Sequence, residues 1–169
     1  MYAIGFRVSP TKIFYSIIQK TNTNTNTNTE FISIASLNIP ISIDLPCKLN
    51  FIRNTISTIL IQYEISVAGI KLIEGNARSS VNNNLIFRFN VEGVIMELFA
   101  NSAVKAYFLG VTSNIASVLK VEKCKPPEML DKIMNLTGVK TDDNKTLSSE
   151  NKESMIVALA AIERELLHG

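Results

Sequence analysis

The sequence has few residues that could support zinc binding or covalent catalysis. Its single histidine, His168, stands beside the C-terminal glycine, and its two cysteines, Cys47 and Cys124, are isolated, with no metal-ligand spacing. A structural zinc site is therefore not expected. A terminal histidine is also a poor general base, which argues against Ser–His or Cys–His catalysis. We expect both thiols to be free.

Long apolar runs and phosphate-binding glycine motifs are also missing. No uninterrupted apolar segment approaches the roughly 18 residues that a membrane-spanning helix needs, and the first residues do not have the pattern of a signal peptide. Gly75, Gly93 and Gly110 form neither a GxGxxG nor a P-loop pattern. We therefore expect a cytoplasmic protein without a membrane contact and without a nucleotide cofactor.

The charge of the chain is nearly balanced. Residues 1–120 carry ten Lys or Arg against six Asp or Glu, whereas residues 121–169 carry seven against nine. The first part would offer an anion a modest basic surface, far weaker than that of a dedicated DNA-binding domain. Ordinary solvated charge explains the same counts. With 169 residues, of which 46% are apolar, the composition predicts one globular domain over residues 1–169.

The first third of the chain has the pattern of β-structure. Apolar and alternating segments predict strands over residues 2–8, 12–19 and 30–37. Residues 21–29 are a strict Thr-Asn alternation, which is low-complexity sequence. This segment is either an extended hairpin tip or a neutral repeat expansion in a surface loop.

Helices and strands alternate in the remainder. The elements expected there are a helix over about 49–64, a buried strand over 66–73, a loop over 74–84, a helix over 90–101, a strand over 104–109, a short helix or turn over 113–119, a helix over 126–136 and a final helix from Ser148 or Ser149 through Leu167. Asn90 would cap the second helix and place Glu92 in its first turn. The polar stretch 141–149 is expected to be a mobile loop. The order predicts a mixed five-stranded sheet.

Two segments resemble a known group of nucleases. The apolar run Ala3-Ile4-Gly5-Phe6 ends at Arg7 and is followed by a turn and a second strand, and the chain closes with the helical run Met-Ile-Val-Ala-Leu-Ala-Ala-Ile. With the element order, these segments resemble the RNase H-like superfamily, and RuvC-type resolvases in particular. The resemblance implies an α/β fold with three antiparallel strands, then alternating α and β elements, and helices on both faces of the sheet.

The resemblance also implies a metal site that this sequence lacks in part. Nucleases of this superfamily hold two divalent ions with three or four carboxylates, at the end of the first strand, the end of the strand after the first helix, and the start of the final helix. Here those places hold Arg7, Lys71 and Glu153. Because two cations would repel Mg²⁺, we predict a degraded acidic site and no metal or other cofactor.

Two interpretations of the acids stay open. Glu74, Glu92 and Glu153 would form the catalytic group of a divergent Mg²⁺-dependent nuclease if the loop after Lys71 folded back over the sheet. Otherwise Glu92 and Glu153 are helix-start charges and Glu74 is a solvated loop acid.

Two interpretations of the cations also stay open. Arg7 and Lys71, with Arg78 and Arg88 nearby, would form an anion-binding patch that holds a nucleic-acid backbone without cutting it, because arginine suits phosphate through its forked donors. Alternatively, Arg7 and Lys71 pair with the acids in a purely structural cluster.

Three classes of function follow. The first is a nucleic-acid-binding or assembly module, a pseudo-nuclease with the nuclease fold. The second is the divergent nuclease. The third is a structural subunit that binds a protein partner, or another copy of itself, through apolar surface and an exposed sheet edge.

Overall fold

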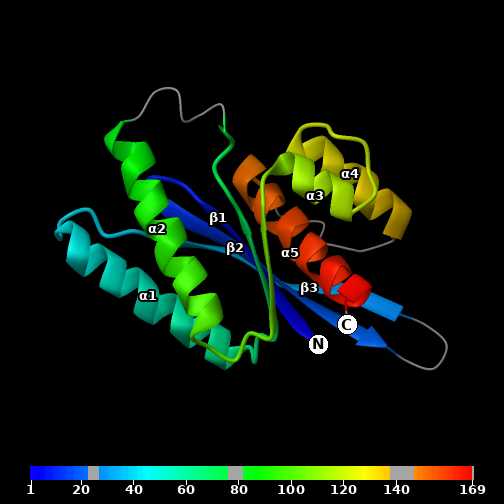
Figure 1. The fold of residues 1–169 in the computed structure, drawn as a ribbon, viewed down its shortest axis with the longest axis horizontal. Coiled ribbons are helices and arrows are strands. Elements are labelled where there is room, and N and C mark those ends of the chain that lie inside the picture. Colours follow the sequence, from blue (N-terminus) through cyan, green and yellow to red (C-terminus); the bar gives the residue numbers. More distant parts are fainter. Residues whose placement is uncertain (23–26, 76–81, 138–146, 169) are drawn as a thin grey trace.

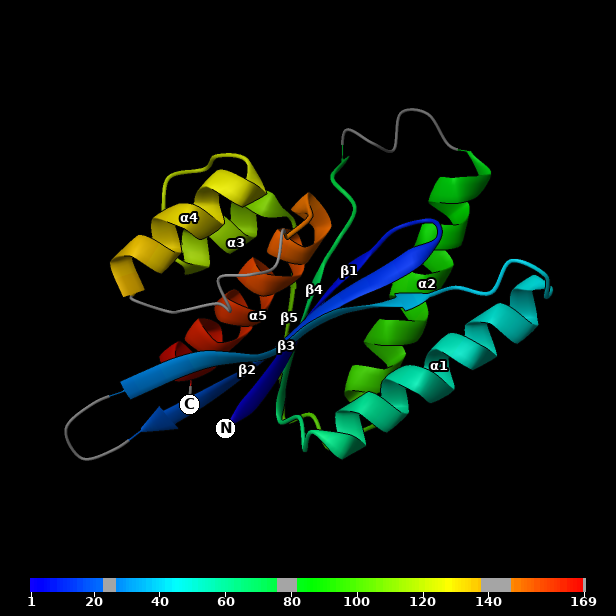
Figure 2. The ribbon, with the colours of Figure 1, turned by 180° about the vertical axis from the view of Figure 1, so that it is seen from behind.

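In the computed structural model, a central sheet separates two groups of helices. The structure describes residues 1–22, 27–75, 82–137 and 147–168. Figures 1 and 2 show α1 and α2 on one face of the sheet and α3, α4 and α5 on the other. Among the helices of these described residues, none is long and apolar enough to cross a membrane.

The order of the elements agrees with the predicted order. The strands are β1 (Tyr2–Val8), β2 (Lys12–Asn22), β3 (Thr27–Asn38), β4 (Val67–Lys71) and β5 (Ala106–Gly110). The helices are α1 (Leu45–Gln62), α2 (Asn83–Ala100), α3 (Thr112–Val118), α4 (Pro126–Thr137) and α5 (Ser149–His168). The strands lie in the order β3-β2-β1-β4-β5, antiparallel among β1, β2 and β3 and parallel from β1 through β4 to β5. The predicted mixed five-stranded sheet with helices on both faces is confirmed.

Side-chain alternation along β1 and β4 divides the core into two. Ile4 and Phe6 of β1 pack with Ile70 of β4 against the side of α1 and α2. Ala3 and Val67 face the other way and pack against α5. Since successive strand residues point to opposite faces, Arg7, the residue before the last of β1, and Lys71, the last residue of β4, both lie on the α5 side. The sheet register also sets these two residues opposite each other.

Two glycines allow α5 to lie unusually close to the sheet. A Cβ atom added to Gly5 would meet the backbone of Ser154 and of Ala158, the latter at 2.5 Å. At Gly69 it would lie 2.8 Å from the carbonyl oxygen of Val157. The small residues of α5 therefore pack directly on Gly5 and Gly69, which have no side chain. This close packing fixes the start of α5 over the ends of β1 and β4.

The predicted start of α2 is wrong. The helix begins at Asn83, with the side chain of Asn82 accepting a hydrogen bond from the backbone N–H of Leu85 at 3.0 Å. Asn90 is therefore inside the helix and caps nothing, and Glu92 lies in the middle of the helix instead of its first turn. Asn82 stabilises this helix start because its side chain accepts from the N–H of Leu85, which has no partner within the helix.

Two other predicted boundaries differ. Helix α1 begins at Leu45, four residues earlier than expected, because Asp44 caps it and Pro46 fits its first turn. The hairpin of β2 and β3 extends into the Thr-Asn segment from both sides, with Thr21 paired to Asn28. Residues 23–26 lie outside the described residues, as does most of the predicted mobile loop at 141–149, whose last residue, Ser149, begins α5.

Candidate functional site

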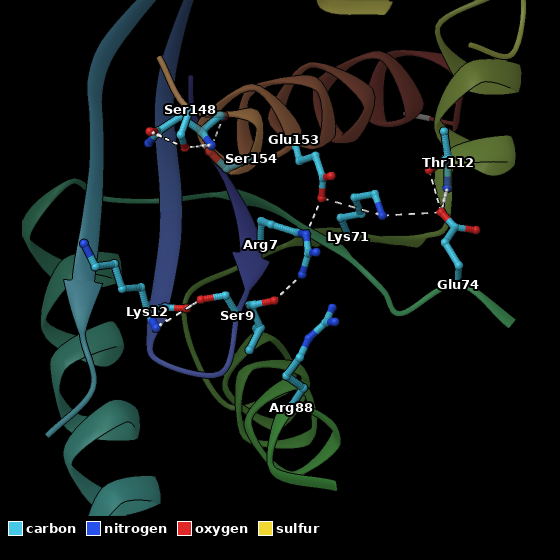
Figure 3. A network of polar contacts seen from close by, with 12 residues as sticks. Arg7, Ser9, Lys12, Lys71, Glu74, Arg88, Thr112, Ser148, Glu153 and Ser154 are labelled. Atoms are coloured by element: carbon cyan, nitrogen blue, oxygen red, sulfur yellow. Dashed lines mark hydrogen bonds and ion pairs between the residues drawn. The ribbon is translucent and has the colours of Figure 1, made fainter. Parts of the chain in front are cut away.

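Arg7 and Lys71 share one carboxylate at the carboxyl ends of β1 and β4. The Nε of Arg7 donates to Oε2 of Glu153, and the Nζ of Lys71 lies 3.7 Å from the same oxygen (Figure 3). The side chains of Arg7, Lys71 and Glu153 are 16%, 6% and 13% exposed, respectively. Arg7 also donates through Nη1 to the carbonyl of Val8, which fixes the orientation of its guanidinium. The strand ends thus hold two cations around one buried oxygen.

Glu153 does not act as a helix-start charge. Helix α5 begins at Ser149, with the hydroxyl of Ser148 accepting from the backbone N–H of Asn151 at 3.1 Å. The acid in the first turn is Glu150, and Glu153 lies about one turn further in. The predicted first-turn position is therefore wrong, and the carboxylate contacts the sheet cations instead of free N–H groups.

Glu74 joins the cluster from the loop after β4. Its Oε1 lies 3.3 Å from Nζ of Lys71 and accepts hydrogen bonds from the backbone N–H of Thr112, at 2.9 Å, and from the Thr112 hydroxyl. Burial alone would raise the pKa of Glu74. The hydrogen bonds from Thr112 and the charge of Lys71 outweigh this effect and lower the pKa. Glu74 therefore links the lysine to the start of α3.

Arg88 and Glu92 enter from α2 on the opposite side. They lie one helical turn apart, with Nη2 of Arg88 3.8 Å from Oε1 of Glu92, whose side chain is only 4% exposed. Among the described residues, Nε of Arg88 and Oε1 of Glu92 are the buried side-chain atoms without a hydrogen-bond partner. Burial raises the pKa of Glu92, although Arg88 opposes the shift. Burial and the charge of Arg7 lower the pKa of Arg88.

These contacts bring together six of the seven residues singled out in the sequence. They are Arg7, Lys71, Glu74, Arg88, Glu92 and Glu153. Figure 3 shows Arg88 extending from α2 toward Arg7. The seventh, Arg78, lies outside the described residues. The sequence reasoning missed Thr112 as a partner of Glu74. Its position just after β5, a parallel neighbour of β4, is the signal that would have suggested it.

The six residues comprise three cations and three carboxylates, joined by ion pairs in two groups: Glu74, Lys71, Glu153 and Arg7 in one, and Arg88 and Glu92 in the other. We call this group the strand-end charge cluster. In the part of the chain that the structure describes, no three His, Cys, Asp or Glu side chains lie close enough together to hold a metal ion.

Several solved structures with the same architecture are Holliday junction resolvases. Thermus thermophilus RuvC matches with a TM-score of 0.77 at 9% identity, over 99% of this chain and 97% of that one. The yeast mitochondrial Holliday junction resolvase Ydc2 matches with a TM-score of 0.65 at 12% identity, over 98% and 80%. The fowlpox virus resolvase in complex with Holliday junction DNA matches with 0.56 at 15%, over 99% of each chain.

Comparisons by sequence give no further assignment. No protein-family model matches the chain, and no curated protein matches it. The similarity therefore lies in the structure, and it covers the whole sheet and its helices. The chain has the RNase H-like fold in the form found in RuvC and other Holliday junction resolvases.

Proposed function

We propose that this protein is a nucleic-acid-binding or assembly module that holds branched DNA without metal-dependent cleavage. The observation that carries the proposal is the pair of cations, Arg7 and Lys71, on the adjacent ends of β1 and β4. In nucleases of this fold, carboxylates at these strand ends hold the metal ions. The fowlpox and Thermus resolvases of the same fold have been solved with Holliday junction DNA, which makes a DNA junction the natural ligand to test.

The cluster does not fit a pair of divalent cations. A divalent ion needs free carboxylate oxygens, and one oxygen of each of two acids is already engaged: Oε2 of Glu153 faces Arg7 and Lys71, and Oε1 of Glu74 faces Lys71 and Thr112. At about 4 Å and an effective dielectric constant of about 20, each unit of like charge costs about 4 kcal/mol. A divalent ion beside two buried cations would meet this repulsion several times over.

A phosphodiester fits the same donors better. Arginine offers parallel N–H groups to the oxygens of a phosphate, and lysine adds a point charge. Arg88 contributes a buried Nε that has no hydrogen-bond partner. The cations of the strand-end charge cluster therefore offer one phosphate of a DNA backbone several charge-assisted hydrogen bonds.

Binding of a labelled four-way DNA junction over a range of salt concentrations tests the proposal. Arg7→Ala and Lys71→Ala should each weaken binding several-fold and reduce the slope of log K against log salt by roughly 0.9 per lost phosphate contact. Arg53→Ala is the matched control, because Arg53 forms an exposed ion pair with Glu97 on the α1–α2 side, outside the cluster. If the wild type does not bind at low salt, the proposal fails and a structural subunit with a protein partner becomes the better reading.

A divergent nuclease is the second candidate, and one observation favours it. Glu92 is buried beside Arg88, its Oε1 has no hydrogen-bond partner, and Arg7 and Lys71 also lie close enough to affect its pKa. An acid of this kind would accept a metal ion if the cations moved aside. A calorimetric titration with Mn²⁺ tests this candidate. Stoichiometric binding that disappears in Glu92→Gln supports it, and the absence of binding heat at millimolar Mn²⁺ excludes it.

A further inference from the structure

The carboxylate of Glu153 contacts both Arg7 and Lys71, the two cations proposed above to hold a phosphate. Both cations face one carboxylate oxygen of Glu153, and all three side chains are largely buried. A carboxylate and a phosphodiester each present a charged, forked acceptor of similar geometry to such donors. Nε of Arg7 donates to Glu153, and Nη1 donates to the carbonyl of Val8. A phosphate can therefore bind the Nε edge of this guanidinium only in place of Glu153.

We propose, on the basis of the function proposed above, that Glu153 is a built-in competitor of the DNA backbone. Its carboxylate closes the cation site in the free protein, and a backbone phosphate must displace it from Arg7 and Lys71 in order to bind. Glu153 is thus a regulatory residue of the binding site and is not a catalytic acid.

The surroundings of Glu153 favour exchange by side-chain rotation. Helix α5 is held against Gly5 and Gly69 by backbone contacts that leave no space for a Cβ atom, so the helix itself stays in place. Glu153 lies near the start of that helix, and its side chain retains 13% exposure. A rotation about its side-chain bonds therefore suffices to free both cations.

The two cations remain positioned after the exchange. The Val8 carbonyl continues to hold the Arg7 guanidinium, and Glu74 continues to face Lys71 at 3.3 Å. Arg88, whose Nε has no hydrogen-bond partner and whose side chain extends toward Arg7 in Figure 3, offers the incoming phosphate a further donor. The competitor can thus be removed without dismantling the site.

Two substitutions of Glu153 separate competition from a simple change of net charge. Glu153→Gln removes the negative charge, whereas Glu153→Asp keeps it but shortens the side chain by one methylene, so that the carboxylate no longer reaches Arg7 from the same helix position. Glu97→Gln is the control, because it removes the same charge from an exposed ion pair with Arg53. Thermal melts and circular dichroism establish that each variant is folded.

The probe is a labelled four-way DNA junction, with affinity measured from low salt upward. Glu153→Gln should bind about ten-fold more tightly at about 0.1 M salt, with a slope steeper by up to about 2 for two released cations. Glu153→Asp should gain affinity at unchanged net charge, and Glu97→Gln should keep the wild-type slope. Adding Arg7→Ala to Glu153→Gln should remove the gain.

The results distinguish this inference from the function on which it rests. If the wild type binds and weakens in Arg7→Ala, but Glu153→Gln and Glu153→Asp bind no more tightly than Glu97→Gln, the competitor role is wrong and the DNA-binding function stands. If neither the wild type nor any Glu153 variant binds the junction at low salt, both proposals are wrong. Binding that appears only in the Glu153 variants supports the blocking role of Glu153 but overturns DNA binding as the function of the wild-type protein.

Discussion

Gly5→Ala should destabilise the protein by separating α5 from the sheet. A Cβ atom at this position would overlap backbone atoms of Ser154 and Ala158 and lie 2.8 Å from Cγ1 of Val157. Backbone cannot rotate away as a flexible side chain can, so the helix must shift. Forcing an extra carbon into a packed core costs about 1–3 kcal/mol, and the loss of unfolded-chain entropy returns only about 0.4–1 kcal/mol.

The expected net loss is about 1–2 kcal/mol, which for a domain of this size lowers Tm by roughly 2–8 °C. Gly93→Ala is the matched control. Gly93 lies exposed in the interior of α2, and a Cβ atom there meets nothing within 4 Å. This substitution should raise stability by about 0.5–1 kcal/mol, because alanine is the better helix former. Differential scanning calorimetry of both variants is the assay. An unchanged or raised Tm in Gly5→Ala would refute the close packing of α5 on β1.

Three further predictions concern two acids of the strand-end charge cluster and a buried pair of serines. Because burial raises the pKa of Glu92, the free energy of unfolding should fall as pH rises from the ordinary glutamate range through that raised pKa, and Glu92→Gln should be the more stable protein at neutral pH in urea titrations. The pKa of Glu74 is lowered, so the stability it contributes should be lost as pH falls through that pKa. Glu74→Gln should therefore have a lower Tm than wild type at neutral pH, and the two should converge in acid. Ser154→Ala leaves the buried hydroxyl of Ser16 without its 2.6 Å partner. It should cost about 1–3 kcal/mol in urea denaturation, and the double variant with Ser16→Ala should cost less than the two single losses combined.

The sheet and the central pair of cations could be predicted from local pattern. Apolar runs ending at Arg7 and near Lys71 predicted two strands, and their parallel pairing sets Arg7 opposite Lys71 near the carboxyl ends of both strands. The pairing of these cations with Glu153 and Glu74 was one of the two alternatives left open, and the contacts are those of that alternative. These features follow from strand geometry, which depends on few long-range details.

The boundaries of α2 could not be predicted in the same way. Residues 87–90, Phe-Arg-Phe-Asn, alternate apolar and polar side chains as a strand does, which obscured the helical pattern. Asn90 was therefore the predicted cap, whereas Asn82 caps the helix. Because of that error, Glu92 was predicted at a solvated helix start, whereas it is buried in the middle of α2. Burial depends on which face of the helix meets the sheet, and the tertiary packing determines that face.

The most direct test of the account is cleavage of a labelled four-way junction under single-turnover conditions with Mg²⁺ or Mn²⁺. Binding is followed by gel shift in the same samples, with protein in excess. The account predicts that the junction is fully bound in all three conditions, with EDTA, with Mg²⁺ and with Mn²⁺, and that no strand is cut in any of them. Metal-dependent cleavage that disappears in Glu153→Gln would contradict it, because Glu153 would then be holding a metal ion instead of closing the cation site.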